Sequence, residues 1–441
     1  MQKWQFISLC WLFSLTQNLL AQDLMTVYQQ ALTADPKIQA AQLQIQIVDA
    51  QKGQAFGEML PQVNGSANWS FNDQRREVQT RTGTGHTNEN YVGTRYTLSL
   101  TQTVIDFAKF WNWKRAQKIQ DQVTIENTET VNKLMLDVVD RYFSVLEAED
   151  QLYLVQTEIR LMEKTLNQVQ QQYEKQLIKV TDLYDIEARL DKLKADAIEL
   201  EKNVAVAKEG LAELTGQAPV ALKKLSEQLL YRPLEGKLEK WLDVAKSQNP
   251  ALLAQFKAIE AAADNLSVQQ ARNLPVVDLQ LNYYLTNTGY QSSNIGNTEV
   301  GSAALNITVP LFSGGAGIER INEAQYRMTL TRYDHESKLR AVIKETRDAF
   351  LTTNASYNRI QAAEKAIFSA KKSYESMVKS LYYGVETIAD VLTAQQNVFR
   401  AKRELTQVKY TYIKNRIRFL YATGMINEDN LREVNRWLNK S

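Results

Sequence analysis

The chain has 441 residues, and its 52 Lys and Arg side chains nearly balance its 50 Asp and Glu side chains. A formal net charge of +2 gives no electrostatic basis for nucleic-acid binding, which needs a basic face. The only histidines, His86 and His335, lie far apart in the sequence, so we expect no metal site, no His-based catalytic triad, no cofactor and no enzymatic activity.

The first 21 residues have the features of an export signal. Lys3 is the only charged residue before Asp23, and a mostly apolar run covers residues 6–15. A small residue, Ala21, follows at a plausible cleavage point. The run is too short for a membrane-spanning helix, although a membrane anchor is the alternative interpretation. Cleavage after Ala21 would remove the single cysteine, Cys10, and would exclude disulfides from the mature chain.

Two copies of one pattern make up the rest of the chain. Pro36 and Pro61 are 25 residues apart, as are Pro250 and Pro275, and Asp182 and Gly216 are 34 residues apart, as are Asp390 and Gly424. Matched spacings of this kind indicate an internal repeat, for which gene duplication is the simplest explanation. We therefore predict one repeat over residues 22–235 and a second over residues 236–441.

Each copy contains two segments in which apolar and polar residues alternate. They cover residues 62–72 and 92–104 in the first copy, and residues 276–286 and 300–311 in the second. Alternation with a period of two predicts strands with one apolar and one polar face. Each segment has about the 9–11 residues that a tilted strand needs to cross a bilayer. A soluble sandwich would also alternate, but four strands in an otherwise helical chain favour the membrane interpretation.

Gly, Ser, Thr and Asn are concentrated in the segments that join these elements. Residues 82–85 and 288–296 connect the strand partners and are expected to be exposed loops. Residues 313–317 (Ser-Gly-Gly-Ala-Gly) precede a helix and could be a phosphate-binding loop. They lack the Lys-Ser or Lys-Thr pair of a P-loop, so we interpret them as a strand-to-helix turn.

The remaining sequence predicts helices. Short helices are predicted over residues 36–60 and 250–274, long helices over residues 107–173 and 317–383, and return helices over residues 183–215 and 390–423. Each short helix should end before a proline, which disfavours helix at the preceding residue. The first long helix would extend roughly 100 Å at ~1.5 Å per residue. Helices of this length without a compact core must pair as coiled coils.

Five short motifs follow one another along the chain. They are Asp-Leu-Met-Thr-Val-Tyr-Gln-Gln-Ala at residues 23–31, Asp-Pro at 35–36, Val-Pro-Leu-Phe-Ser-Gly-Gly at 309–315, a segment at 383–394 that begins with Tyr-Gly and ends with Ala, and Ile-Asn-Glu-Asp-Asn-Leu at 426–431. In this order, and together with the duplication, they resemble the TolC-type family of outer-membrane efflux proteins. The resemblance extends over essentially the whole mature chain.

The resemblance implies a mainly α fold with membrane β-strands. Each chain would contribute four strands to a shared 12-stranded barrel of a homotrimer, and its helices to a long periplasmic coiled-coil barrel. The strand count supports an oligomer independently. Single-chain membrane barrels begin at about eight strands, so four strands cannot close, and an open edge in lipid leaves backbone groups unpaired.

The implied function is a passive exit duct in the outer membrane, with its tunnel in the periplasm, for tripartite efflux or type I secretion. An inner-membrane pump and a periplasmic adaptor would open it, and outer-membrane lipid would surround the barrel. A periplasmic coiled-coil protein with a structural or adhesive role and no pore is the alternative.

The resemblance also assigns a periplasmic gate to Asp390, Glu386, Asp182 and Thr393. Asp390 would belong to a ring of carboxylates at the tunnel entrance, and Asp182 to the network that holds the tunnel closed. Glu386 and Thr393 stand where the family usually has an Arg and a second Asp, so the closing network departs from the family pattern. Helix capping is the alternative role for the two aspartates, because Asp is favoured at helix starts.

Gly384, Val385, Leu177 and Gln176 are the residues that the resemblance assigns to contact with an adaptor at the helix-hairpin tips. Gln176 stands where a glycine is usual in the family, so the first tip departs from the family pattern.

Five aromatic residues in the predicted strands could form the belt that aromatics favour at a membrane surface. They are Trp69, Phe71, Tyr96, Tyr283 and Tyr284.

Overall fold

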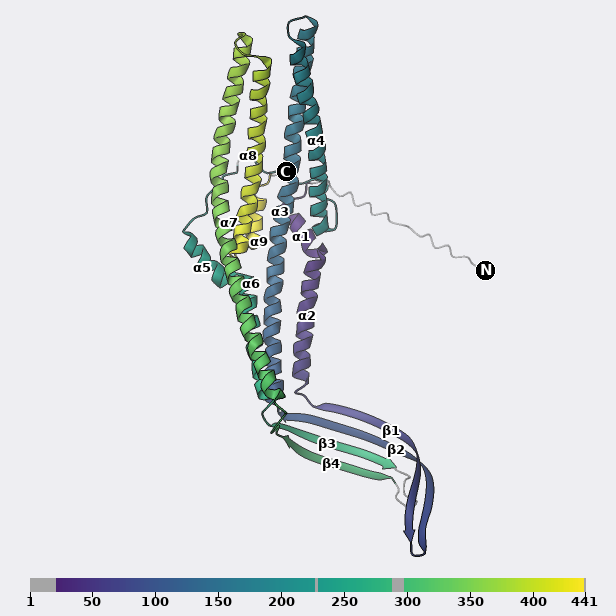
Figure 1. Ribbon diagram of the computed structural model, residues 1–441. Helices are drawn as coiled ribbons and strands as arrows, with labels where there is room; N and C mark the ends of the chain where they lie inside the picture. The colour runs from purple at the N-terminus through teal and green to yellow at the C-terminus, as the bar shows by residue number, and fades with distance from the viewer. Residues whose placement is uncertain (1–20, 227–228, 288–296, 440–441) are drawn as a thin grey trace, which may run out of the picture. The chain divides into compact units, whose positions relative to one another are not determined.

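The computed structural model describes residues 21–226, 229–287 and 297–439 (Figure 1). Its elements are α1 (Leu24–Ala34), α2 (Pro36–Gly57), β1 (Gln62–Thr80), β2 (Gly83–Ile105), α3 (Phe107–Glu174), α4 (Val180–Thr215), α5 (Leu238–Gln248), α6 (Pro250–Ala271), β3 (Val276–Asn287), β4 (Thr298–Thr308), α7 (Ala316–Tyr382), α8 (Ile388–Ala422) and α9 (Glu428–Asn435). The predicted export signal, except for Ala21, and the predicted loop at residues 288–296 lie outside the described residues.

These elements belong to two compact units, each built from both halves of the sequence. Unit 1 comprises residues up to 39, 131–242 and 345–441, and unit 2 comprises residues 40–130 and 243–344. The compact units therefore cut across the two predicted repeats, since each unit takes one part from each repeat.

Unit 2 contains a four-stranded antiparallel sheet in the order β1-β2-β3-β4. The predicted last residue of the first strand, residue 72, and the predicted first residue of the second strand, residue 92, are wrong. β1 continues to Thr80 and pairs with β2 back to Gly83, so Thr82 alone of the predicted loop residues 82–85 lies in the turn (Figure 1). Apart from Val78 and Tyr91 the added hairpin is polar, and the alternation that signals a strand is therefore missing there.

The strand register gives the sheet one apolar and one polar face. Side chains on directly paired residues share a face. The apolar face carries Val63, Ala67, Trp69, Phe71, Val92, Tyr96, Leu98, Leu100, Leu279, Leu281, Tyr283, Leu285, Ala303, Leu305 and Ile307. The opposite face carries Asn64, Ser66, Asn68, Arg95, Thr97, Ser99, Asp278, Gln280, Asn282, Ser302 and Asn306. The predicted period of two is thus present in all four strands.

The short helices of unit 2 end three residues earlier than predicted. α2 ends at Gly57 and α6 at Ala271, and the three residues before each proline form turns instead. In these turns the Leu60 N–H donates to the Gly57 carbonyl at 3.1 Å, and the Leu274 N–H donates to the Ala271 carbonyl at 2.9 Å. The proline therefore shortens the helix by about one turn rather than by a single residue.

Unit 1 has the larger apolar core, which joins both ends of the described chain. Buried Leu24 and Tyr28 of α1 pack with Tyr142 and Phe143 of α3 and with Leu431 of α9. The Tyr142 hydroxyl lies 3.0 Å from the carbonyl oxygens of both Gln22 and Lys223. Short β-bridges pair Gln22 with Leu222 and Leu225 with Leu438. The beginning of the chain, the segment between the repeats and the C-terminal segment therefore share one core.

A row of polar contacts joins α3 to α8 within unit 1. The Arg403 Nη1 donates to Glu158 Oε2 at 2.5 Å, and the Tyr410 hydroxyl donates to Asp150 Oδ2 at 2.6 Å. Lys414 Nζ donates to Glu147 Oε2 at 2.9 Å. The Glu158 side chain is only 2% exposed, and this burial raises its pKa above the ordinary 4.5 although Arg403 opposes the shift.

We expect Arg403→Met to destabilise unit 1 by about 3 kcal/mol at neutral pH, because it leaves the buried Glu158 carboxylate without its cation. The raised folded-state pKa means that the folded state binds the Glu158 proton more tightly than the unfolded state does. The stability deficit should therefore shrink as the pH falls from about 7.5 to about 5. Denaturant unfolding of the detergent-solubilised protein at several pH values measures it.

The double variant Glu158→Gln, Arg403→Met is the matched control, since it has no titrating group at this position. A deficit of Arg403→Met that stays constant with pH, or one equally pH-dependent in the double variant, would contradict this assignment.

Candidate functional site

The two helix-hairpin tips of unit 1 have the same backbone geometry. After α3, the Leu177 N–H donates to the Gln172 carbonyl at 3.0 Å, and the Gln176 N–H donates to the Tyr173 carbonyl at 2.8 Å. After α7, the Val385 N–H donates to the Ser380 carbonyl and the Gly384 N–H to the Leu381 carbonyl, both at 3.0 Å. This pair of bonds is the Schellman motif, which satisfies the last carbonyls of a helix.

Gln176 and Gly384 occupy the left-handed position of this motif, with φ of 60° and 73°. Gln176 is the single non-glycine residue with a positive φ in the described part of the chain. A side chain at such a position costs about 1 kcal/mol, whereas glycine has no such cost. The first tip therefore keeps the same backbone as the second tip at the expense of local strain.

Large apolar side chains are exposed at both tips. Leu177 is 70% exposed and Val385 is 75% exposed. Tyr382 and Tyr383, also exposed, stack edge to face with ring centroids 5.4 Å apart. The residues predicted to contact an adaptor, Gly384, Val385, Leu177 and Gln176, thus lie at the two turns.

Asp390 occupies the third position of α8 and takes part in a capping box. Its Oδ2 accepts from the Thr387 N–H at 3.1 Å and from the Thr387 hydroxyl at 2.5 Å, while Thr387 Oγ1 accepts from the Asp390 N–H at 3.3 Å. The Thr387 hydroxyl, and then its backbone N–H, lower the pKa of Asp390 below its ordinary value. These contacts therefore favour the ionised form of the carboxylate and orient it toward the backbone of Thr387.

Asp182 occupies the equivalent third position of α4 but has no capping box. The residue before the helix is Lys179, whose side chain makes no capping hydrogen bond. The predicted starts of the return helices, residues 183 and 390, are three and two residues late, and the N-cap residues are Lys179 and Thr387 rather than the aspartates. The capping signal that we missed is Thr387 followed three residues later by an acidic residue.

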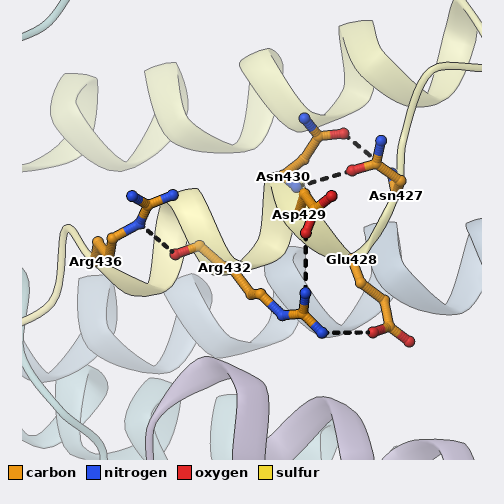
Figure 2. A network of polar contacts seen from close by, with 6 residues as sticks. All are labelled: Asn427, Glu428, Asp429, Asn430, Arg432 and Arg436. Carbon is orange, nitrogen blue, oxygen red and sulfur yellow. Dashed lines mark hydrogen bonds and ion pairs between the residues drawn. The ribbon is translucent and has the colours of Figure 1, made fainter.

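A second capping box, at α9, shows that a neutral amide can replace the carboxylate. Asn427 Oδ1 accepts from the Asn430 N–H at 3.0 Å, and Asn430 Oδ1 accepts from the Asn427 N–H at 3.0 Å (Figure 2). Asn at the third position thus makes the same backbone contact that Asp390 makes in α8.

The predicted gate residues fall at the starts of two helices. Glu386 immediately precedes the capping residue Thr387, and Thr393 donates its hydroxyl to the Ala389 carbonyl at 2.9 Å. Leu392 of α8 packs in a small cluster with Ile186 and Leu190 of α4. That cluster brings the first turns of α8 next to the helix that carries Asp182. In the described ranges, no three His, Cys, Asp or Glu residues form a group suited to a metal ion.

Four of the five predicted belt aromatics share the apolar face of the sheet. Trp69 and Tyr96 are in edge-to-face contact, with centroids 5.7 Å apart, and Phe71 and Tyr283 follow the same alternation. Tyr284, the fifth residue predicted for the belt, does not share this face. It pairs with Thr97 and Val300, which puts it on the polar face with Arg95. Two adjacent strand residues point to opposite faces, so only one of Tyr283 and Tyr284 could belong to the belt.

The backbone difference between the tips is testable. Gln176→Gly should slow local opening of residues 173–178 about fivefold, because it removes roughly 1 kcal/mol of left-handed strain. Gly384→Ala should speed opening of the second tip by a similar factor, since nothing crowds a Cβ there and only its φ is unfavourable. Amide hydrogen exchange measures both, and unchanged exchange in both variants would show that φ does not limit the stability of the tips.

None of the helices in the described residues combines the length and the apolar character that a membrane crossing requires.

A sequence model of the outer membrane efflux proteins matches residues 27–217 and 241–425 of this chain. The chain is 28% identical over 433 residues to the outer membrane protein TolC of Salmonella enteritidis, a match that covers 95% of this chain and 85% of that protein. It is 27% identical over 439 residues to the alkaline protease secretion protein AprF of Pseudomonas aeruginosa. This match covers 96% of this chain and 90% of that protein.

Solved structures have the same fold. A crystal structure of CusC superposes with a TM-score of 0.80 at 20% identity and covers 93% of this chain and 96% of that one. The structure of the outer membrane protein VceC from Vibrio cholerae superposes with a TM-score of 0.79 at 18% identity. It covers 91% of this chain and 96% of that one. Because the family match extends over most of its length, the chain belongs to the outer membrane efflux protein family and is located in the outer membrane.

Proposed function

We propose that three copies of this chain form a passive exit duct through the outer membrane for efflux or type I secretion. The observation that carries the proposal is the four-stranded sheet. Along the described chain β1 and β4 each have one strand partner, so the sheet has two edges. Three copies would join edge to edge into a closed barrel of about twelve strands, which leaves no backbone group unpaired in lipid.

The exposed apolar face of the sheet supports a lipid-facing role. Trp69 and Ile307 are each 64% exposed, and Val63 and Leu98 are also exposed. A water-soluble sheet would bury such side chains against a second layer. The polar face would then line the duct, and the polar extension of the β1–β2 hairpin would project beyond the apolar band.

The long helices α3 and α7 would form the periplasmic tunnel, and the hairpin tips of unit 1 would meet the adaptor. Exposed Leu177, Val385 and Tyr383 offer apolar contact area at the turns. An inner-membrane pump would supply the energy, and the family relationship supports this division of labour. Relatives named for protease secretion and for cation efflux mark the two classes of system in which such a duct could serve.

The gate would lie at the start of α8. In a threefold assembly, Asp390 and Glu386 would contribute two carboxylates per subunit around the axis, with Thr393 one turn further along the helix. Such a ring attracts cations and binds a multivalent ion more strongly than a single carboxylate can. Asp182 would belong to the neighbouring hairpin, where no capping contact fixes its side chain.

The assembly is tested by its size and its conductance. We expect an SDS-resistant trimer in outer-membrane extracts and discrete conductance steps in planar bilayers. A protein that is monomeric in mild detergent and silent in bilayers would instead fit a periplasmic coiled-coil protein without a pore.

Two substitutions of Asp390 separate its charge from its capping role. Asp390→Asn removes the charge but keeps an acceptor for the Thr387 N–H, as Asn430 does in α9. Asp390→Ala removes both. If the charge forms the gate, both variants should lose cation selectivity and block by a trivalent cation at low salt to a similar extent, and salt should screen the difference from wild type.

Asp182→Asn is the matched control and should have the smaller effect. If only Asp390→Ala changes the channel while Asp390→Asn behaves as wild type, Asp390 is a helix cap and the gate lies elsewhere.

A further inference from the structure

Unit 1 contains a cationic pocket with a volume of about 380 Å³. It is lined by residues of α8, by Ser226 and residues within 229–232, and by residues within 433–437 at the end of α9 and after it. Its charged lining residues are Arg232, Arg416, Arg436 and Glu433. Tyr412 and Trp437 also line it. The volume falls in the range of about 300–1,000 Å³ that is typical of small-molecule sites.

The lining has three guanidinium groups and one carboxylate. Arg416 is the partner of Glu433, at 3.4 Å. Across the described residues, Arg232 and Arg436 have no carboxylate within ion-pair distance. Among the described lining residues, two of the three guanidinium groups therefore have no carboxylate partner.

The nearby carboxylates of α9 are already engaged elsewhere. Arg432 Nη2 lies 3.2 Å from Glu428 Oε2, and Arg432 Nη1 lies 2.9 Å from Asp429 Oδ1 (Figure 2). Arg432 is not part of the pocket lining, so these two carboxylates neutralise a different arginine. The Arg436 side chain donates only its Nε, to the Arg432 carbonyl at 3.4 Å, among the side-chain contacts of the described residues (Figure 2).

The walls of the pocket are held in place by contacts that do not use the free guanidinium nitrogens. The buried Tyr412 hydroxyl donates to the Arg232 carbonyl at 2.6 Å and accepts from the Arg232 N–H at 3.3 Å. The Arg416 guanidinium carbon lies 5.9 Å from the centre of the Trp437 ring, and the Trp437 carbonyl accepts from the Ser226 N–H at 2.9 Å. A ligand would therefore meet a pre-formed site.

The chemistry of the walls selects an anion with an organic body. A guanidinium presents a planar fork of donors that matches a carboxylate or a phosphate. Leu229, Leu230 and Trp437 add apolar surface beside the arginines. We propose that the cationic pocket binds an organic oxyanion, in which a carboxylate or phosphate group contacts Arg232 and Arg436 and a sugar or apolar part lies against Trp437. This site is independent of the exit duct, and its ligand would link α8 to the C-terminal segment.

Binding can be tested on the full-length protein in detergent by titration calorimetry and thermal unfolding. The probes are inorganic phosphate, glycerol 3-phosphate and glucuronate, with chloride at equal ionic strength and neutral glucose as controls. We expect at least one oxyanion to bind and to raise the unfolding temperature more than chloride does. Preference for the phosphates would identify a phosphate ligand, and preference for glucuronate a sugar carboxylate.

Matched arginine variants assign the binding to the pocket. Arg232→Gln and Arg436→Gln should each weaken binding about tenfold or more, and Arg436→Lys should weaken it less because it keeps the charge but loses the fork. Arg432→Gln removes the same charge from the same helix outside the pocket and should leave binding unchanged. Far-UV circular dichroism and the unfolding temperature without ligand show whether each variant is folded.

Equal effects of chloride and the oxyanions would overturn the proposal. So would unchanged binding in both Arg232→Gln and Arg436→Gln, or an equal loss in Arg432→Gln, since each result would mean that the anion acts on general surface charge.

Discussion

Backbone hydrogen bonding at the two sheet edges is the constraint on which the proposed assembly depends. Hydrocarbon offers no water to pair with N–H and C=O groups, so an open four-stranded sheet is not stable in a bilayer. The order β1-β2-β3-β4 puts the first and last strands of the chain at the edges. Copies of one chain can therefore close the barrel by pairing β4 of one with β1 of the next. Oligomerisation then follows from the strand count rather than from a particular side-chain contact.

The register of the sheet decides which residues could meet lipid. The apolar face reaches as far as Phe71 and Val92, which pair with each other, and the hairpin beyond them is polar apart from Val78 and Tyr91. This change is expected where a strand leaves the hydrocarbon, because an apolar face is then no longer favoured. The same register separates Tyr283 from Tyr284, although the two residues are adjacent in sequence.

Sequence patterns predicted the strands and helices that depend on the periodicity of neighbouring residues. Alternation and helical spacing identified all four strands and the long helices, and the predicted ends of the long helices are within one residue of those observed. The polar hairpin of residues 73–91 gave no such signal, since neither face is buried. The Glu158–Arg403 pair was not predictable either, because the two residues are 245 positions apart and their burial depends on packing between α3 and α8. For the tips, matched spacing predicted their equivalence but not which residue caps each helix.

The two tips share one backbone geometry but differ in the contacts of their aspartates. Both turns end in the same Schellman motif, and both following helices carry Asp at the third position. Thr387 fixes the Asp390 carboxylate through hydrogen bonds, whereas Lys179 gives Asp182 no equivalent contact. In the proposed threefold assembly, the Asp390 carboxylate would lose these hydrogen bonds if it rotated away from like charges, so the bonds would favour relief of the repulsion by cations or by movement of the helices. A carboxylate without that contact can turn toward solvent. If the proposed gate is a ring of carboxylates, the difference between Lys179 and Thr387 would favour the second tip over the first as its position.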